Sequence, residues 1–247
     1  GVMGFADLLA MMRVSYDSDE GLELGRSLMQ FIREESDRRS SELADERGVF
    51  PAFKGSVYDA PNQPQMRNAC RLTVAPTGTI SMIAGCSSGI EPIFSLAFRK
   101  QNILEGKTLF YVDSNFERIA RERGFYSEEL LEHLSDGGSL QVRDDVPEDV
   151  KRLFHVATDI SPEYHVKMQA AAQKWVDSSI SKTINCPEDI SFDAFKDVYM
   201  AAWDQVGGAS YGAISCSEPL LSGFHAEDIS AVGAPLQIVQ PREYVVY

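Results

Sequence analysis

Residues 67–81 constrain the fold of this chain more than any other segment. Residues 69–75 have the composition of a buried strand, and a turn containing Pro and Gly follows at residues 76–78. A short apolar helix is then predicted over residues 80–84. A strand that leads through a tight turn into a helix is typical of folds in which strands and helices alternate. We therefore expect an α/β architecture.

The same turn has the features of a phosphate-binding site. Residues 76–80 lie where the first backbone N–H groups of a helix have no partner within the helix, and these groups attract anions. Gly78 allows a ligand to approach the backbone, and Thr77 and Thr79 add hydroxyl donors. The predicted phosphate-binding residues are Pro76, Thr77, Gly78, Thr79, Ile80 and Ser81. The alternative is an ordinary turn in which a Thr side chain only caps the helix.

Charge and hydropathy exclude several classes of protein. The chain has 247 residues and a net charge of −14, which argues against a general nucleic-acid-binding protein, because contacts with the phosphate backbone need clustered Lys and Arg. No apolar run is long enough to span a membrane, and no secretory signal pattern opens the sequence, so we expect a cytoplasmic protein. Because the first residue is Gly1 rather than Met, we expect a piece of a longer chain.

Hydrophobic periodicity predicts the other elements. Helices are expected at residues 4–12, 18–47, 115–122, 127–134, 162–177 and 193–203, and strands at residues 69–75, 93–98, 106–112 and 180–185. Ser18, Ser127 and Pro162 are the start signals of three of these helices, and Gly48 is a stop signal. Residues 135–150 are predicted to be a polar surface excursion. The alternation favours mostly parallel strands.

The cysteines and histidines form no pattern that predicts a metal or catalytic site. Cys70, Cys86, Cys186 and Cys216 lack the spacing of a zinc site, and we expect small buried residues rather than disulfides. The four histidines are likewise predicted to be surface or hydrogen-bonded core residues. We predict no metal ligands and no catalytic residues in this chain.

Two charged residues allow more than one interpretation. Lys182, on the predicted strand 180–185, is either a phosphate contact or a solvated side chain. Glu91 is either a structural tie to backbone amides or a general acid. Trp175 and Trp203 lie on apolar helix faces and are predicted to be core residues.

The turn sequence and several distant stretches together resemble a known family. Besides the turn, the matching stretches are residues 1–9, 82–92, 99–104, 159–166 and 177–185, in the order that the family has them. The chain resembles the barrel of the ribonucleotide reductase large chain, and among its types most closely the adenosylcobalamin-dependent one. The resemblance covers residues 1–205 and leaves residues 206–247 as an atypical tail without an assigned fold.

This resemblance implies a fold and a reaction. The family fold is a ten-stranded α/β barrel, of which this chain would be the C-terminal portion. The family reaction converts ribonucleotides to deoxyribonucleotides through a thiyl radical, which adenosylcobalamin generates in the type that the chain resembles. In that fold the turn at residues 76–80 holds the phosphates of a ribonucleoside di- or triphosphate, which agrees with the prediction from the residues.

The sequence departs from the family pattern at two places. The family motif Asn-x-Cys-x-Glu, which carries the radical cysteine, is absent, and the nearest match at residues 68–72 has Leu72 in place of Glu. We therefore expect this chain to be inactive alone, to bind no cofactor alone, to require the N-terminal half of the barrel and to self-associate through its exposed edges. The second departure is that no Val-Tyr-Arg strand follows residue 205, which suggests a truncated or shifted reading frame. The alternative function is a non-catalytic nucleotide- or phosphate-binding module, or one half of a split enzyme.

Overall fold

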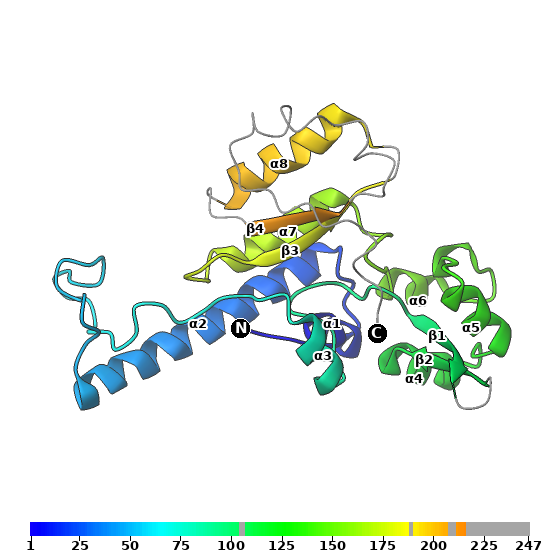
Figure 1. The fold of residues 1–247 in the computed structure, drawn as a ribbon, viewed down its shortest axis with the longest axis horizontal. Helices are drawn as coiled ribbons and strands as arrows, with labels where there is room; N and C mark the ends of the chain where they lie inside the picture. The colour runs from blue at the N-terminus through cyan, green and yellow to red at the C-terminus, as the bar shows by residue number, and fades with distance from the viewer. Residues whose placement is uncertain (104–106, 188–189, 207–210, 216–247) are drawn as a thin grey trace.

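The computed structural model describes residues 1–103, 107–187, 190–206 and 211–215 (Figure 1). Its elements in chain order are α1 (Phe5–Met12), α2 (Asp19–Arg47), α3 (Gly78–Ala84), β1 (Ala97–Ile103), β2 (Lys107–Val112), α4 (Ser114–Arg123), α5 (Glu128–Ser135), a 3-10 turn (Leu140–Val142), α6 (Glu148–Leu153), α7 (Pro162–Gln173), β3 (Ser181–Asn185), α8 (Phe192–Val206) and β4 (Tyr211–Ser215). The predicted alternation of helices and strands is found only over α7, β3, α8 and β4, and the described part of the chain has far more helix than strand.

Helix α2 is the longest of the described helices, and its start and end follow the sequence signals. The Ser18 hydroxyl accepts a hydrogen bond from the Gly21 N–H at 3.0 Å, and Gly48 ends the helix with a positive φ of 77°. Gly25 lets α2 approach its neighbours closely, because a Cβ there would lie 3.0 Å from Met168 Sδ and 3.2 Å from Phe5 Cζ. The first half of α2 thereby joins the central core with α1 and α7.

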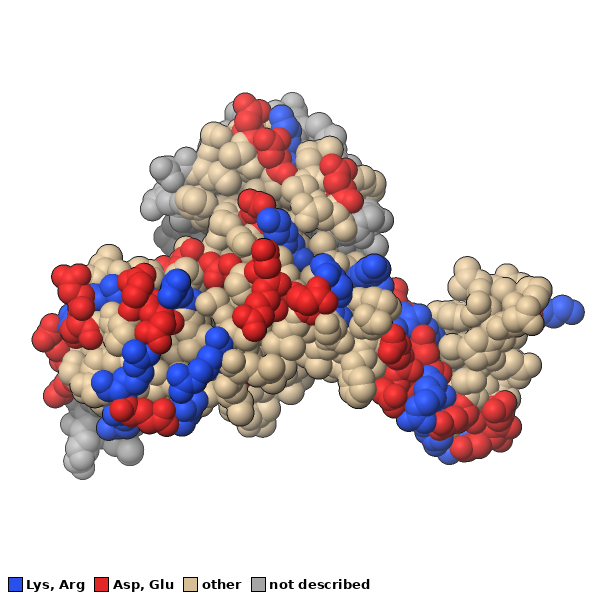
Figure 2. All heavy atoms as spheres, turned by 180° about the vertical axis from the view of Figure 1, so that it is seen from behind, with Lys and Arg blue, Asp and Glu red and all other residues tan. Residues whose placement is uncertain are grey.

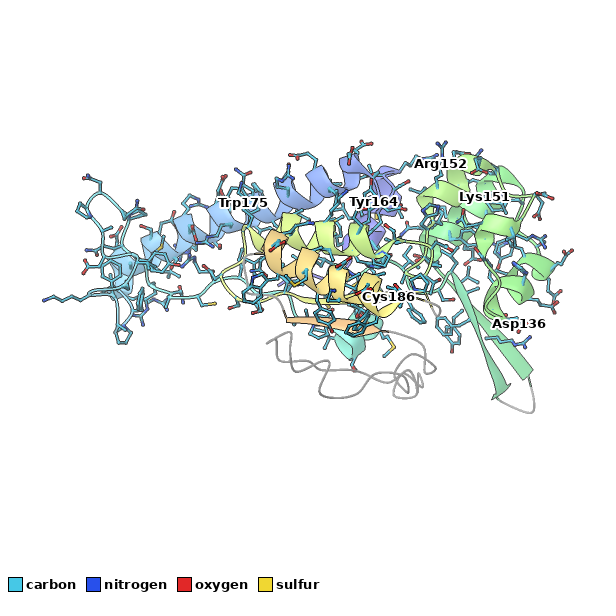
Figure 3. The ribbon with its side chains drawn as sticks, turned by 90° about the horizontal axis from the view of Figure 1, so that it is seen from above. Asp136, Lys151, Arg152, Tyr164, Trp175 and Cys186 are labelled. Carbon is cyan, nitrogen blue, oxygen red and sulfur yellow. The ribbon has the colours of Figure 1, made fainter. Side chains whose placement is uncertain are left out.

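A small parallel sheet lies beside α7, which packs between α2 and α8 (Figures 1 and 3). Strand β3 pairs in parallel with β4 on one side, and Ile180 forms a parallel bridge with Val74 on the other. The predicted strand at residues 69–75 is therefore reduced to a single bridge at Val74. Strand β4 gives residues 211–215 a place in this sheet, whereas the sequence assigned them none, and residues 216–247 lie outside the described residues.

A second group of elements, β1, β2 and α4–α6, has a core of its own. Strands β1 and β2 form an antiparallel hairpin, so the expectation of mostly parallel strands is wrong for this pair. The prediction of a polar excursion at residues 135–150 is also wrong, because Leu140, Val146 and Val150 are buried in this core. Three apolar residues spaced among acidic ones are enough to anchor a short helical segment there.

The surface is divided into charged and uncharged regions. Acidic and basic side chains alternate along α2 and over the α4–α6 group, whereas the surface between them is largely uncharged (Figure 2). Helix α3 projects from this region with Ile80, Met82 and Ile83 exposed. Trp203 on α8 is 56% exposed, so its prediction as a core residue is wrong, whereas Trp175 packs against the central core. None of the described helices is long and apolar enough to cross a membrane.

Candidate phosphate-binding site

The turn before α3 presents three backbone N–H groups without partners among the described residues. The first hydrogen bond of the helix runs from the Ser81 N–H to the Thr77 carbonyl at 2.9 Å, so the N–H groups of Gly78, Thr79 and Ile80 have no acceptor within α3. All three residues are exposed, and a Cβ built on Gly78 would meet no atom within 4 Å. The geometry thus leaves open space in front of the first turn of α3.

Thr77 connects the start of this helix to the end of the loop that follows it. Its backbone is left-handed, with φ 54°, and its hydroxyl accepts a hydrogen bond from the Gly89 N–H at 2.8 Å instead of capping α3. Gly89 also has a positive φ, and a Cβ there would lie 3.0 Å from the Ala75 carbonyl oxygen. A left-handed backbone at a Thr costs about 1–2 kcal/mol, so the surrounding contacts must hold it.

The predicted site residues therefore separate into three groups. Gly78, Thr79 and Ile80 present free N–H groups, and the Thr79 hydroxyl forms no hydrogen bond with any described residue. Thr77 can still donate its hydroxyl hydrogen, while Pro76 has no N–H and only shapes the turn. The Ser81 side chain points inward: it is 2% exposed, and its hydroxyl bonds to the Gly78 carbonyl and the Ser88 hydroxyl.

The loop after α3 is held from behind by α1. The Asp7 carboxylate accepts a hydrogen bond from the Ser87 N–H at 2.6 Å, and the Gly4 N–H donates to the Ser87 carbonyl at 2.8 Å. Sequence reasoning did not connect Asp7 with this loop, because the contact joins residues 80 positions apart.

The turn segment, residues 74–91, is attached to β3 at both of its ends. At the first end, Ser181 N–H donates to the Val74 carbonyl at 2.9 Å. At the other end, Glu91 accepts hydrogen bonds from the Thr183 N–H at 2.7 Å and from Lys182 Nζ at 2.6 Å. Glu91 is thus a structural tie to a backbone amide, as one of the two interpretations predicted. The prediction of a solvated Lys182 is wrong, since its side chain is fully buried.

Lys182 is the centre of a buried polar cluster. Its Nζ also lies 2.9 Å from His165 Nδ1, and His165 Nε2 lies 3.1 Å from the Ala157 carbonyl. The ring therefore donates from Nε2 and accepts at Nδ1. Burial, and next the charge of Lys182, lower the pKa of His165 to about 3. Burial likewise lowers the pKa of Lys182, against the opposing charge of Glu91.

Asp177 organises the segment that leads into the turn. Its carboxylate accepts hydrogen bonds from the Arg71 N–H at 2.8 Å and the Leu72 N–H at 3.0 Å, and it pairs with the Arg33 guanidinium at 2.9 Å. Burial raises the pKa of Asp177. The two N–H donors and the guanidinium groups of Arg71 and Arg33 outweigh that effect and hold the pKa below its usual value. Helix α2 is thereby linked to the residues before the turn.

The cysteines contribute no metal or disulfide site within the described residues. Cys70, Cys86 and Cys186 form no disulfide bond with one another. They are not buried as predicted, since Cys70 is exposed and the other two are half-buried. No group of three or more His, Cys, Asp or Glu side chains suited to a metal ion occurs among the residues that the structure describes. Cys216 lies outside that part of the chain.

Comparison with known proteins places the chain in a family. The family model "Ribonucleotide reductase, barrel domain" matches residues 1–65 and 62–209. The Vitamin B12-dependent ribonucleoside-diphosphate reductase of Thermoplasma acidophilum is 47% identical over 204 residues, which cover 83% of this chain and 26% of that protein. The protein of the same name from Mycobacterium tuberculosis H37Rv is 43% identical over 203 residues, covering 82% of this chain and 28% of the relative.

A solved structure shows the same fold. The Actinobacillus ureae class Id ribonucleotide reductase alpha subunit superposes with a TM-score of 0.71 at 24% identity, covering 90% of this chain and 39% of that one. The chain spans about a quarter of the length of the curated relatives that it matches. The resemblance predicted from the sequence is confirmed: the chain belongs to the ribonucleotide reductase barrel family.

Proposed function

We propose that this chain provides the substrate phosphate-binding turn of a ribonucleotide reductase, the enzyme that converts ribonucleotides to deoxyribonucleotides. The observation that supports the proposal is the set of three outward N–H groups at Gly78, Thr79 and Ile80, with open space in front of them. The relatives at 43–47% identity are named ribonucleoside-diphosphate reductases, so we propose a ribonucleoside diphosphate as the substrate.

The electrostatics of the turn suit a phosphate even though the chain is acidic. Between Arg71 and Arg99 the only charged residue is Glu91, and its charge is compensated by Lys182. Backbone dipoles and the Thr79 hydroxyl therefore face the ligand without an uncompensated carboxylate from the turn segment itself. We infer that positioning is the role of this segment, since fixing the phosphates holds the ribose in place over the reacting cysteine.

The reacting groups belong to other parts of the enzyme. The motif Asn-x-Cys-x-Glu is absent from the sequence, so we place the radical cysteine in the remaining part of the barrel, which with this chain would complete the ten strands that the family resemblance implies. Because the relatives are named vitamin B12-dependent, we propose that the complete enzyme uses adenosylcobalamin, and we assign no residue of this chain to it. A cytoplasmic location follows from the proposed use of free nucleotides.

The test is nucleotide binding by the complete reductase with changes confined to the turn. Gly78→Ala adds a methyl group that meets no protein atom, so it should leave the fold intact while it occupies space in front of the N–H groups. Thr79→Val removes a hydroxyl that forms no hydrogen bond with the described residues. We expect each variant to weaken binding of a ribonucleoside diphosphate by roughly 1–3 kcal/mol, measured by equilibrium dialysis.

Thr73→Val is the matched control. Thr73 is exposed, and its hydroxyl donates to the Ser179 carbonyl, which lies outside the turn. This variant should keep the affinity of the unmodified enzyme. Equal affinities in all four proteins would refute the assignment of the turn.

A further inference from the structure

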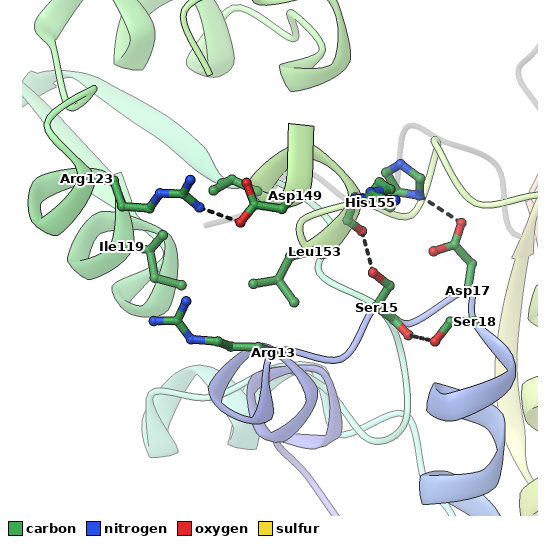
Figure 4. Close-up of a pocket in the computed structure, with 11 residues that line it drawn as sticks. Arg13, Ser15, Asp17, Ser18, Ile119, Arg123, Asp149, Leu153 and His155 are labelled. Carbon is green, nitrogen blue, oxygen red and sulfur yellow. Dashed lines mark hydrogen bonds and ion pairs between the residues drawn. The ribbon is translucent and has the colours of Figure 1, made fainter. Parts of the chain in front are cut away.

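A pocket of about 430 Å³ lies between the end of α1, the start of α2 and helices α4 and α6 (Figure 4). None of the predicted phosphate-binding residues lines it. Its lining residues include three arginines and a histidine, which are Arg13, Arg123, Arg152 and His155. This concentration of cations is unexpected on a chain with a net charge of −14.

Two of these four basic side chains are already paired. Arg123 lies 2.5 Å from the Asp149 carboxylate, and His155 Nδ1 lies 2.8 Å from Asp17. The guanidinium groups of Arg13 and Arg152, in contrast, form no ion pair with any residue that the structure describes. Because Asp17 and Asp149 are the only acids in the lining, the pocket retains a positive charge.

The backbone of Arg13 suggests that its side chain is needed there. Arg13 ends α1 in the left-handed conformation, with φ 60°. Gly85 and Gly124 end α3 and α4 in the same conformation, and glycine adopts it without strain. An arginine at such a position is a cost to the fold, and strain of this kind is typical of functional sites.

The pocket also has a fixed frame and an apolar wall. The Ser15 hydroxyl donates to the Arg152 carbonyl at 2.9 Å, and the Ser18 hydroxyl donates to the Ser15 carbonyl at 2.6 Å, so the loop before α2 is tied to α6. Ile119 and Leu153 line the space between these polar groups (Figure 4). Arg13 and Arg123 lie on the side of Ile119, and His155 and Asp17 lie on the opposite side.

From these observations we propose that the pocket is a second anion site, which binds a phosphorylated small molecule through Arg13 and Arg152. One guanidinium group can bind two phosphate oxygens through two parallel N–H···O hydrogen bonds. The volume of the pocket lies in the range of small-molecule sites. The apolar wall at Ile119 and Leu153 accommodates the uncharged part of the ligand. This site is separate from the turn at residues 76–80.

The test is a titration of the ¹⁵N-labelled 247-residue chain with inorganic pyrophosphate, followed by amide chemical shifts. The amides of residues 15–18 report on the pocket, and those of residues 78–81 report on the turn. We expect saturable shifts at residues 15–18, and these should persist when Thr79→Val and Gly78→Ala are introduced. Shifts confined to residues 78–81, or no shifts at all, would overturn the second site while leaving the proposed function of the turn intact.

The variants Arg13→Gly and Arg152→Gln identify the ligands. Arg13→Gly removes the guanidinium and replaces it with the residue that the left-handed backbone prefers, so the chain should fold at least as well. In the double variant Arg13→Gly/Arg152→Gln, the shifts at residues 15–18 should report a pyrophosphate affinity that is at least about tenfold weaker. The double variant Arg38→Gln/Arg118→Gln makes the same change in net charge at exposed positions outside the pocket, and it should stay within about twofold. Equal weakening in both double variants would mean that only net charge matters, and the proposal would fail.

Discussion

Single buried side chains determine how the turn before α3 is held. Lys182 is fully buried and connects Glu91, His165 and the backbone of β3. A buried charge of this kind is stable only while its partners are present. The cluster therefore fixes the end of the turn segment more firmly than an apolar contact would, because a shift of Glu91 leaves a charge without a partner.

We predict that Lys182→Met destabilises the chain by about 3–5 kcal/mol, since it leaves the Glu91 carboxylate near an apolar core. Urea unfolding followed by circular dichroism measures this loss. The matched control is Lys196→Met on α8, where the lysine is exposed and pairs with Asp193, and it should cost less than about 0.5 kcal/mol. A loss from Lys182→Met no larger than the control would contradict the role of the cluster.

His165 gives the chain a pH dependence with a defined sign. Its pKa is about 3 in the folded state and about 6.5 in the unfolded chain, so the unfolded state binds the extra proton. The stabilisation is complete above about pH 6.5 and is lost as the pH falls toward 3. Between pH 7 and pH 5 we expect His165 to account for about 2 kcal/mol of lost unfolding free energy. A His165→Asn variant should lack this loss between pH 7 and pH 5. If the unfolding free energy depends on pH equally in the variant and the unmodified chain, His165 is not the cause.

At the scale of elements, the main anchor of the turn is the link between α2, the segment before the turn and the residues before β3. Asp177 accepts two backbone N–H groups of that segment and pairs with Arg33 of α2. Arg71, whose side chain is 4% exposed, also pairs with Asp177 at 3.1 Å. Removing this one carboxylate leaves two N–H groups without an acceptor, and it takes one of two carboxylate partners from each guanidinium group, since Arg33 and Arg71 also pair with Asp37.

We therefore predict that Asp177→Ala lowers the unfolding free energy by about 3 kcal/mol or more. Hydrogen exchange should show the loss first in the amides of Arg71 and Leu72, whose acceptor disappears. Asp193→Ala removes an exposed carboxylate from the first turn of α8 and is the matched control. Unchanged protection at residues 71 and 72 would show that the segment is held by other contacts.

Local signals in the sequence predicted the helices well. The caps at Ser18 and Ser127, Pro162 at the start of α7 and Gly48 at the end of α2 all occur as expected. The pairing of strands was not predictable in the same way, because it depends on contacts between distant residues. The antiparallel β1–β2 hairpin and the single bridge at Val74 are examples.

The turn before α3 was predictable in its position but not in its internal contacts. The turn at residues 76–80 was identified from Thr, Gly and Pro spacing, which depends on neighbouring residues alone. The inward orientation of Ser81, the bond from Gly89 to Thr77 and the burial of Lys182 depend on the fold around the turn. The pocket with Arg13 was missed for the same reason, since its lining comes from separate helices.

At the scale of the whole molecule, the exposed apolar surface of α3 is the feature that another part of a protein would cover. Ile80, Met82 and Ile83 project on α3 next to the proposed phosphate site, and the chain matches about a quarter of its relatives' length. Apolar side chains grouped in this way are typical of surfaces that another part of a protein covers. We propose that the remaining barrel covers this face, which would enclose the site and exclude water.

A structure of the complete reductase with a bound ribonucleoside diphosphate tests most directly whether the turn before α3 binds the substrate phosphates. We predict phosphate oxygens within about 3 Å of the N–H groups of Gly78, Thr79 and Ile80 and of the Thr79 hydroxyl. We also predict that Ser81 remains turned toward Ser88. Phosphates bound elsewhere in the barrel, with the first turn of α3 in contact only with solvent or protein, would show that this turn does not bind the substrate.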